Sequence, residues 1–319
     1  MMPRILFMGT PDFAVPTLQR LLDDHYPVVG VVCQPDRPQG RHLTLTPPPV
    51  KLLACANGLP VLQPEKVRVP AFETAIRELQ PDLIVTAAYG RILPPNILAV
   101  PPLGCLNIHA SLLPAYRGAA PIQWCLILGE RETGVTIQMM DAGMDTGDIL
   151  LQRRIAIPDD MDAGQLSDRL AAMGAEMIPE AIRGLLDGTL QRQPQDHARA
   201  TVISMMTREV GEIDWNADAL TIHNLVRGTY PWPGAWTWCG ERRLKVHRAR
   251  VCADPDILRA ASGLAPGTIC QCGVQAISVA CGSGVLDLLE IQSEAGKRLH
   301  CRDCAHNYRL GQKMGGASE

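Results

Sequence analysis

Apolar and polar positions repeat with two different periods along the first part of the chain. Apolar runs of strand length occupy residues 4–8, 28–33, 82–86, 103–109, 135–140 and 149–157. Segments with apolar residues at helical spacing occupy residues 12–22, 71–79, 121–128 and 163–186. Such alternation is typical of a mainly parallel sheet covered by helices on both faces, so we predict an α/β domain. The last two strands follow each other closely enough to be antiparallel neighbours.

The pattern changes after a polar segment, residues 188–200, which lacks periodicity and contains Pro194. A helix is predicted over 217–227, and short β-like runs separated by turn residues occupy 235–239, 244–250, 267–270, 276–280 and 285–291. Such runs are typical of a small barrel. We therefore divide the 319 residues into a first domain, 1–188, a linker, 189–206, and a second domain, 207–319.

Composition excludes several classes of protein. Hydrophobic residues make up 46% of the chain and charged residues 20%, which is too apolar for an intrinsically disordered chain. Prolines interrupt the longest stretch that is almost free of charge, residues 92–116, and the N-terminal segment lacks the features of a secretory signal. We expect a cytoplasmic protein with no membrane partner.

The 11 cysteines are odd in number and scattered, unlike a disulfide framework. Cys301 and Cys304 form one CxxC pair, which is a weak zinc signal without a second pair at fixed spacing. We favour free thiols and expect no metal.

Positive charge gathers in one place, although the net charge is −3. Between Glu241 and Arg250 the chain carries one acidic residue and the basic residues Arg242, Arg243, Lys245, Arg248 and Arg250. Such a run is either a solvated strand face or a surface for nucleic-acid phosphates. The charge pattern alone leaves both open.

Chemistry-bearing side chains follow the strand predicted at 103–109. Asn107 and His109 share one face of it near its carboxyl end, where open parallel sheets bind ligands. An amide donor and an imidazole there could polarise a carbonyl and move a proton. Asp145, in a glycine-flanked acidic loop, could orient the imidazole and stabilise its charged form, or could simply bond to the backbone of its own turn. Spacing alone does not bring Asp145 to His109.

A dinucleotide site is not indicated, because the turn after the first strand, Gly9-Thr10-Pro11, lacks the G-x-G-x-x-G pattern. Instead, Asn107-x-His109, the string SLLPAYRGAAPIQW from Ser111 and the later Asp145 resemble the family of enzymes that use 10-formyltetrahydrofolate. The resemblance extends over nearly the whole chain, through RILFMGTPDFAVPTL, CQPDRPQGR, PPPVK, GEIDW, YPWPGAWT, GKR and YRLG. It implies a Rossmann-like formyltransferase domain followed by an OB-like β-barrel domain that binds tRNA.

The resemblance also implies a reaction, the transfer of a formyl group from 10-formyltetrahydrofolate to the α-amine of methionine on initiator tRNA. Asn107 would donate to the formyl oxygen, His109 would stabilise or protonate the developing tetrahedral centre, and Asp145 would hold the imidazole. The folate would be a co-substrate, and neither a metal nor a covalent intermediate would be required. We expect a monomer.

Binding residues are implied in the same way. The folate pocket would be lined by Ser111, Leu112, Leu113 and Pro114. Residues around Tyr89, Gly90 and Ile92 would form part of the wall that contacts the pterin ring. The tRNA would be contacted by Arg41, Lys51, Arg242, Arg243, Lys245, Arg248, Lys297 and Arg298. In the loop 34–50 this sequence departs from the family, since His42-Leu43-Thr44 stands where lysines often follow the arginine.

Two alternative functions are left open by the sequence. The first keeps the folate chemistry but transfers the formyl group to an amino sugar or to water. The second is a nucleic-acid-binding protein without activity, against which the intact Asn107, His109 and Asp145 argue.

Overall fold

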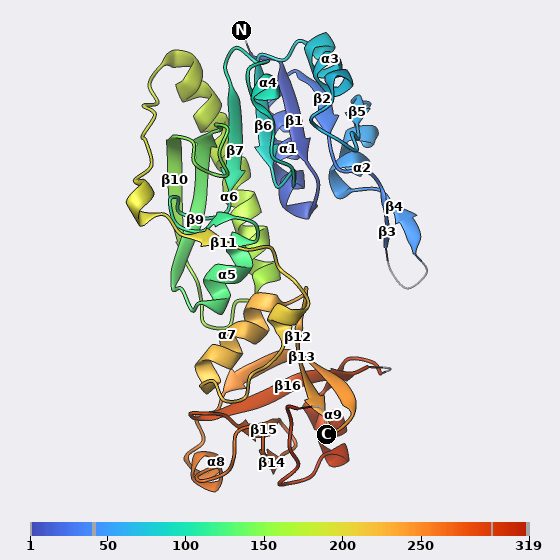
Figure 1. Ribbon diagram of the computed structural model, residues 1–319, viewed down its shortest axis with the longest axis vertical. Helices are drawn as coiled ribbons and strands as arrows, with labels where there is room; N and C mark the ends of the chain where they lie inside the picture. Colours follow the sequence, from blue (N-terminus) through green and yellow to red (C-terminus); the bar gives the residue numbers. More distant parts are fainter. Residues whose placement is uncertain (1, 40–42, 295, 317–319) are drawn as a thin grey trace. The chain divides into compact units, whose positions relative to one another are not determined.

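The computed structural model describes residues 2–39, 43–294 and 296–316. By their internal contacts these residues form two compact units (Figure 1). Unit 1 comprises residues 1–121, 132–156 and 167–203, and unit 2 comprises 122–131, 157–166 and 204–319. Segments of the two units therefore alternate along the chain, because residues 122–131 and 157–166 belong to unit 2. The predicted division into 1–188, 189–206 and 207–319 does not include this alternation. The domain boundaries themselves stay a prediction.

Unit 1 contains a seven-stranded sheet in the order β10-β9-β7-β6-β1-β2-β5 (Figure 1). Its strands are β1 (Ile5–Gly9), β2 (Val28–Val32), β5 (Val61–Leu62), β6 (Leu83–Ala87), β7 (Cys105–His109), β9 (Glu132–Met139) and β10 (Ile149–Ala156). The pairs from β5 to β7 are parallel, whereas β9 is antiparallel to both β7 and β10. The predicted mainly parallel sheet and the antiparallel pair after it are confirmed.

Helices flank this sheet, and one of them covers one face of β7. They are α1 (Val15–Asp23), α2 (Pro49–Ala56), α3 (Pro70–Leu79), α4 (Pro95–Leu98) and α6 (Ala163–Asp187), with the short η1 (Asp12–Ala14) before α1. At Gly174 of α6 an added Cβ would lie 2.6 Å from a methyl carbon of Ile108, so α6 packs tightly on that face of β7. Because side chains alternate along a strand, Asn107 and His109 lie on the opposite face.

The sequence reading missed α2 and α4. Both begin with proline at the first helical position, where the missing N–H costs nothing and the fixed φ favours the helix. Both also lie in proline-rich stretches with no clear helical period. The hairpin β3 (Arg37–Gln39) and β4 (Thr44–Thr46) was not predicted either.

The polar segment after α6 is packed onto unit 1, not free. Gln193 pairs through its backbone with Ile149, and after a 3-10 turn η2 (His197–Arg199), β11 (Val202–Ile203) pairs in parallel with β8 (Arg117–Gly118). These contacts use backbone groups and polar side chains, so they leave no apolar period in the sequence. Residues 193–203 are therefore part of unit 1, although the sequence assigns them to a linker.

Unit 2 is built on antiparallel strands in the order β12-β13-β16-β15-β14, with β17 beside β16 (Figure 1). The strands are β12 (Ala235–Cys239), β13 (Arg242–Val251), β14 (Ile269–Cys272), β15 (Ile277–Ala280), β16 (Val285–Ser293) and β17 (Leu299–His300). Met314 bridges to Cys239 and Lys313 bridges to Thr268, so the C-terminal segment joins the two ends of the sheet. The predicted small antiparallel barrel is confirmed.

The helices of unit 2 pack around this barrel. They are α5 (Pro121–Ile127), α7 (Ala219–Thr229), α8 (Pro255–Ala260) and α9 (Cys301–Cys304), with 3-10 turns η3 (Glu209–Gly211) and η4 (Ala305–Asn307). Ile222 and Val226 of α7 join the barrel core, and Arg227 donates to the carbonyl of Pro158 at 3.3 Å. This bond helps to explain why residues 157–166 belong to unit 2.

Among the described residues, no helix is both long and apolar enough to cross a bilayer. Within the same residues no group of three or more His, Cys, Asp or Glu side chains is arranged to hold a metal ion. Cys301 and Cys304 are both buried free thiols, and burial raises the pKa of Cys301 to about 12.

Candidate active site

Asn107 is oriented by the neighbouring strand. Thr86 lies opposite Asn107 in the parallel pair β6–β7, and its hydroxyl donates to Asn107 Oδ1 at 2.7 Å. The carboxylate of Asp145 assigns the amide, because its oxygens only accept, so Nδ2 faces Asp145 and Oδ1 faces the Thr86 hydroxyl. Asn107 Nδ2 lies 3.5 Å from Oδ1 of Asp145.

His109, at the end of β7, is 6% exposed and has an oxygen acceptor at each ring nitrogen. Its Nε2 lies 2.9 Å from the carbonyl oxygen of Tyr116, to which it donates. Its Nδ1 lies 3.5 Å from Asp145 Oδ1. A carbonyl and a carboxylate are both acceptors, so each ring nitrogen faces an oxygen.

Asp145 is held by donors from two other segments. Gln138 of β9 donates from Nε2 to Asp145 Oδ1 at 2.9 Å, and the backbone N–H of Gly118 donates to Oδ2 at 2.9 Å. The backbone of Asp145 is left-handed, with φ +54°, and this turn aims the side chain at β7. The structure thus brings together Asn107, His109 and Asp145, which spacing alone left apart.

The turn that follows His109 is fixed by side chains of β9 and β10. Thr136 donates to the carbonyl of Ser111 at 2.7 Å, and Gln152 donates to the carbonyl of Leu113 at 2.7 Å. The Ser111 hydroxyl donates to the carbonyl of Ala115 at 2.6 Å. Ser111 and Leu113 are buried, so of the predicted folate residues in this turn only Leu112 and Pro114 keep partly exposed surface.

The predicted folate wall divides into buried and exposed members. Tyr89 packs in the core with α3, and burial raises the pKa of its hydroxyl to about 12. Gly90 has φ +79°, which favours glycine, and Ile92 is 54% exposed. Ile92 also lines a hollow of about 380 Å³, which includes Ala142, a residue three positions before Asp145 in the chain. The other residues that line the hollow are Arg68, Val69, Pro70, Glu73, Leu93, Pro94, Pro95 and Asn96.

The predicted tRNA residues of unit 1 are Arg41 and Lys51. Arg41 lies outside the described residues. The ammonium of Lys51 contacts both carboxylate oxygens of Asp36, at 2.9 and 2.8 Å, and Gln63 Oε1 at 2.8 Å. Hydrogen bonds from Lys51 and then Gln63 hold the pKa of Asp36 below its ordinary value. Lys51 therefore fixes the base of the β3–β4 hairpin.

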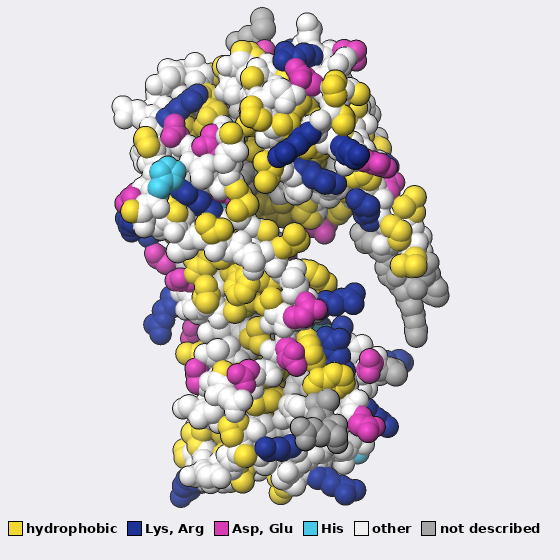
Figure 2. Space-filling view, in the orientation of Figure 1, with side chains coloured by type: hydrophobic (Ala, Val, Ile, Leu, Met, Phe, Trp, Pro, Cys, Tyr) yellow, Lys and Arg dark blue, Asp and Glu magenta, His cyan; other side chains and the backbone are white. Residues whose placement is uncertain are grey.

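Part of the basic run of the barrel is paired within the barrel. Glu290 of β16 receives the guanidinium of Arg298, with Arg248 at 3.6 Å and His300 at 3.5 Å. Arg250 donates to Asp287 at 3.0 Å. Figure 2 accordingly shows Lys and Arg side chains interspersed with Asp and Glu. The count of positive residues in the sequence overstates the free charge of this face.

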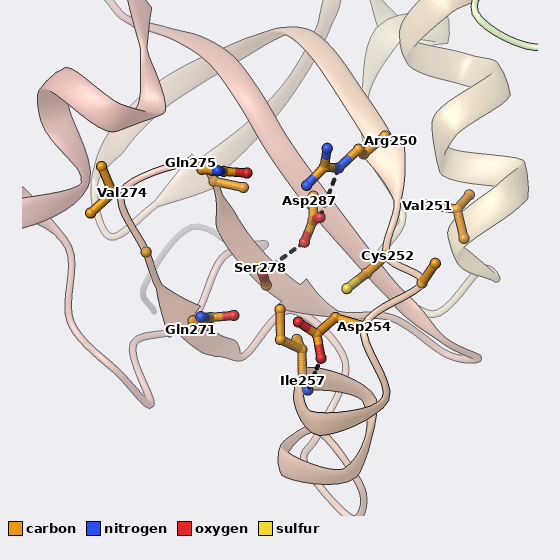
Figure 3. A pocket seen from close by; sticks show the side chains of 13 residues that line it. Arg250, Val251, Cys252, Asp254, Ile257, Gln271, Val274, Gln275, Ser278 and Asp287 are labelled. Atoms are coloured by element: carbon orange, nitrogen blue, oxygen red, sulfur yellow. Dashed lines mark hydrogen bonds and ion pairs between the residues drawn. The ribbon is translucent and has the colours of Figure 1, made fainter.

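The remaining basic residues differ in their surroundings. The Arg243 guanidinium lies 4.0 Å from the centre of the Trp236 ring, a cation–π contact. Arg242, Lys245 and Lys297 are exposed. A pocket of about 420 Å³ opens beside Arg250, Asp287 and Ser278 (Figure 3).

Sequence reasoning missed the side chains that position the cluster, Thr86, Gln138, Gly118 and Gln195. Thr86 carried a usable signal, because it is the one polar residue of the otherwise apolar strand β6. Gln138 carried a weaker one, because β9 also contains Glu132, Thr133 and Thr136. Gly118 carried none. Gln195 stood in a segment that has no period and was assigned to a linker.

Comparison with known proteins identifies the family of this chain. Residues 3–182 match the family model described as formyl transferase, and residues 205–309 match the one described as formyl transferase, C-terminal domain. The methionyl-tRNA formyltransferase of Acetivibrio thermocellus is 48% identical over 98% of this chain and 99% of its own. That of Geobacter metallireducens is 51% identical over 96% of each chain.

A solved structure supports the fold alone. The N-formyltransferase from Helicobacter canadensis aligns with a TM-score of 0.67 at 17% identity, over 90% of this chain and 99% of its own. The family models and the relatives together match residues of both units. The chain therefore belongs to the formyl transferase family and, within it, to the methionyl-tRNA formyltransferases.

Proposed function

We propose that this enzyme transfers the formyl group of 10-formyltetrahydrofolate to the α-amino group of methionyl initiator tRNA. The observation that carries the proposal is the convergence of Asn107 Nδ2 and His109 Nδ1 on one oxygen of Asp145, each at 3.5 Å. Membership of the family supplies the reaction, and this convergence supplies the groups that would perform it.

Asn107 acts on the formyl oxygen. As the amine nitrogen bonds to the formyl carbon, negative charge develops on that oxygen. The Asn107 amide, already oriented by Thr86, is a preorganised donor for it. Removing one such donor typically costs about 2.7–4 kcal/mol of transition-state stabilisation.

His109 and Asp145 act on protons. The bond from the formyl carbon to N10 breaks, the attacking amine loses a proton and N10 gains one, so the reaction needs one net proton movement. The imidazole, held by Tyr116 and Asp145, can donate or stabilise charge, while the carboxylate accepts the proton of the amine through water. Positioned acid–base groups contribute about 10²–10⁴ in rate.

The surroundings of the cluster fit a folate co-substrate. Ile92 presents an exposed apolar side chain to a hollow that also includes Ala142 of the Asp145 loop. Ligand sites of this kind are concave and largely apolar with few polar groups. We assign Gly90, Ile92, Leu112 and Pro114 to direct contact with the folate, and Tyr89, Ser111 and Leu113 to the support beneath it.

The barrel is assigned to the tRNA. Among the predicted tRNA residues of the barrel, Arg242, Lys245 and Lys297 are exposed and available for phosphate contacts, whereas Arg248 and Arg298 share the carboxylate of Glu290. Arg243 with Trp236 offers a charged aromatic surface, and Arg41 contributes from unit 1. Residues 1–188 would hold the reaction and residues 207–319 the tRNA.

The test is formyl transfer from 10-formyltetrahydrofolate to methionyl initiator tRNA, with methionyl elongator tRNA, a nucleotide-linked amino sugar and water alone as competing acceptors. Transfer confined to the initiator tRNA supports the proposal. Turnover of the folate with an amino sugar or water as acceptor would contradict it, while keeping the chemistry of the cluster.

The tRNA assignment has its own test. The double variant Lys245→Ala/Lys297→Ala should lower kcat/KM for tRNA and flatten its salt dependence by about one unit of log–log slope for each lost phosphate contact. Arg259→Ala is the matched control, because Arg259 is exposed on α8 and paired with Asp256. Unchanged tRNA kinetics of the double variant would remove these lysines from the interface.

A further inference from the structure

Gln195 is a buried residue in an otherwise exposed polar segment. It is 6% exposed, whereas Gln193, Pro194, Asp196 and His197 around it are exposed. Its Nε2 donates to two backbone carbonyls of the acidic loop, to that of Asp145 at 2.9 Å and to that of Gly147 at 2.7 Å. One side chain amide therefore holds both sides of the turn that presents the Asp145 carboxylate.

The orientation of this amide is fixed by a charged group. The Arg117 guanidinium donates to Gln195 Oε1 from Nε at 3.1 Å and from Nη2 at 2.7 Å. Arg117 cannot accept a hydrogen bond, so the oxygen of the amide must face it and the nitrogen must face the loop. Arg117 is itself only 6% exposed, so the pair is shielded from water.

The chain neighbours of Arg117 also contact His109 and Asp145. Tyr116, whose carbonyl accepts from His109 Nε2, directly precedes Arg117 in the chain. Gly118, which donates to Asp145 Oδ2, directly follows it. Thr201, six residues after Gln195, accepts from the N–H of Tyr116 through its hydroxyl at 2.8 Å. The segment around Gln195 thus borders both ends of the His109–Asp145 pair.

A contact of this kind is needed because the turn is strained. Asp145 has φ +54°, a conformation that costs a non-glycine residue free energy and persists only where the surrounding structure enforces it. Without donors to its carbonyls the turn can relax, and the carboxylate would then leave the position that faces Asn107 and His109.

We propose that Gln195, oriented by Arg117, is a positioning residue of the transfer reaction that holds the Asp145 loop in its reactive conformation. This inference rests on the proposed function, since it concerns the reaction of the same cluster. Because Gln195 is buried, we assign it no contact with either substrate. Its effect passes through the placement of Asp145, and a displacement of about 1 Å at a reacting group can cost up to about 100-fold in rate.

Gln195→Met tests the proposal, because methionine has similar length and volume but cannot donate to the loop. We expect kcat for formyl transfer to fall by about 10- to 100-fold with KM for the folate changed less than about threefold. Gln195→Glu keeps the acceptor for Arg117 but turns a second oxygen towards the two carbonyls, and it should lose activity as well. Gln193→Met is the matched control, because its exposed side chain lies two residues away and its pairing with Ile149 uses the backbone.

A double-mutant cycle with Asp145→Ala separates positioning from general support of the fold. If Gln195 acts through Asp145, then Gln195→Met should lower single-turnover rates by less than about twofold once Asp145 is already alanine. An equal loss in both backgrounds, or wild-type kcat in Gln195→Met, would overturn the proposal. The unmodified enzyme reports on the proposed function separately, since its failure to formylate initiator tRNA would contradict that function whatever Gln195 does.

Discussion

Oδ1 of Asp145 lies 3.5 Å from Nδ1 of His109, although His109 ends a strand, Asp145 lies in a loop and the two are 36 positions apart in the chain. The opposite ring nitrogen donates to the carbonyl of Tyr116. The imidazole is therefore fixed between a carboxylate and a carbonyl. This relationship places an acid–base group beside the oriented amide of Asn107.

His109→Ala removes this group and should lower kcat at least about 100-fold, because a positioned acid–base group is lost. Affinity for the folate should stay within a few-fold, since the turn at Ser111–Pro114 is held by Thr136 and Gln152 independently of the ring. Steady-state kinetics and calorimetric folate binding measure the two effects. His306→Ala, at an exposed position in η4, serves as control. A His109→Ala enzyme with normal turnover would exclude His109 from the mechanism.

Thr86→Val should lower kcat about tenfold without unfolding the protein. The substitution keeps shape but removes the hydroxyl that donates to Asn107 Oδ1, so the amide loses its fixed orientation and an acceptor loses its partner. Thr17→Val is the matched control, since the Thr17 hydroxyl is buried and has no hydrogen-bond partner among the described residues. It should leave kcat unchanged and unfolding free energy equal or higher. Equal kinetics for the two variants would show that Thr86 does not orient Asn107.

Gly118→Ala should both destabilise the fold and slow the reaction. Gly118 has φ +106°, and an added Cβ would lie 2.6 Å from the carbonyl oxygen of Ile203, which is backbone and cannot turn aside. We expect a loss of about 1–3 kcal/mol in unfolding free energy, and a fall in kcat because the Gly118 N–H that donates to Asp145 is displaced.

Gly188→Ala separates the two causes of that loss. Gly188 has a comparable left-handed backbone, φ +72°, but an added Cβ there meets no described atom within 4 Å. It should cost about 1 kcal/mol from the backbone alone and leave kcat unchanged. Urea unfolding and steady-state kinetics compare the pair. Identical effects of the two substitutions would mean that close contact at Gly118 is unimportant.

The barrel should lose stability in acid through Glu290. Burial acts to raise the pKa of Glu290, but donation from Arg298 and the charges of Arg298, His300 and Arg248 outweigh it and hold the pKa below its ordinary value. A carboxyl whose pKa is lower in the folded state stabilises the fold fully above its unfolded value of about 4.3. That contribution is lost as pH falls through the folded pKa.

Glu290→Gln should therefore be less stable than the parent at pH 7 and differ from it progressively less below about pH 4. Urea unfolding at pH 7, 5, 4 and 3 measures this convergence. Glu294→Gln, at an exposed position just after β16, should follow the parent at every pH. A constant difference between Glu290→Gln and the parent would show that the charge of Glu290 contributes nothing.

Much of the candidate site was readable in the sequence. The apolar run that ends at His109 predicted a strand, and the two-residue period put Asn107 and His109 on one face at its carboxyl end, where the structure has them. The family motif then identified Asp145. The strand and its face were predictable because they depend on local backbone geometry, which a run of side chains reveals directly, whereas Asp145 came from the family resemblance alone.

What the sequence determined by itself is thus the local pattern: the strands and helices with a clear period, and the face on which each side chain lies. The tertiary structure decided which distant groups meet. It seats Gln195 under Asp145, pairs Arg298 with Glu290 and packs residues 193–203 onto unit 1. These contacts join segments that are far apart in the chain. They form through hydrogen bonds and ion pairs, which produce no periodic pattern in the sequence, so only the tertiary structure reveals them.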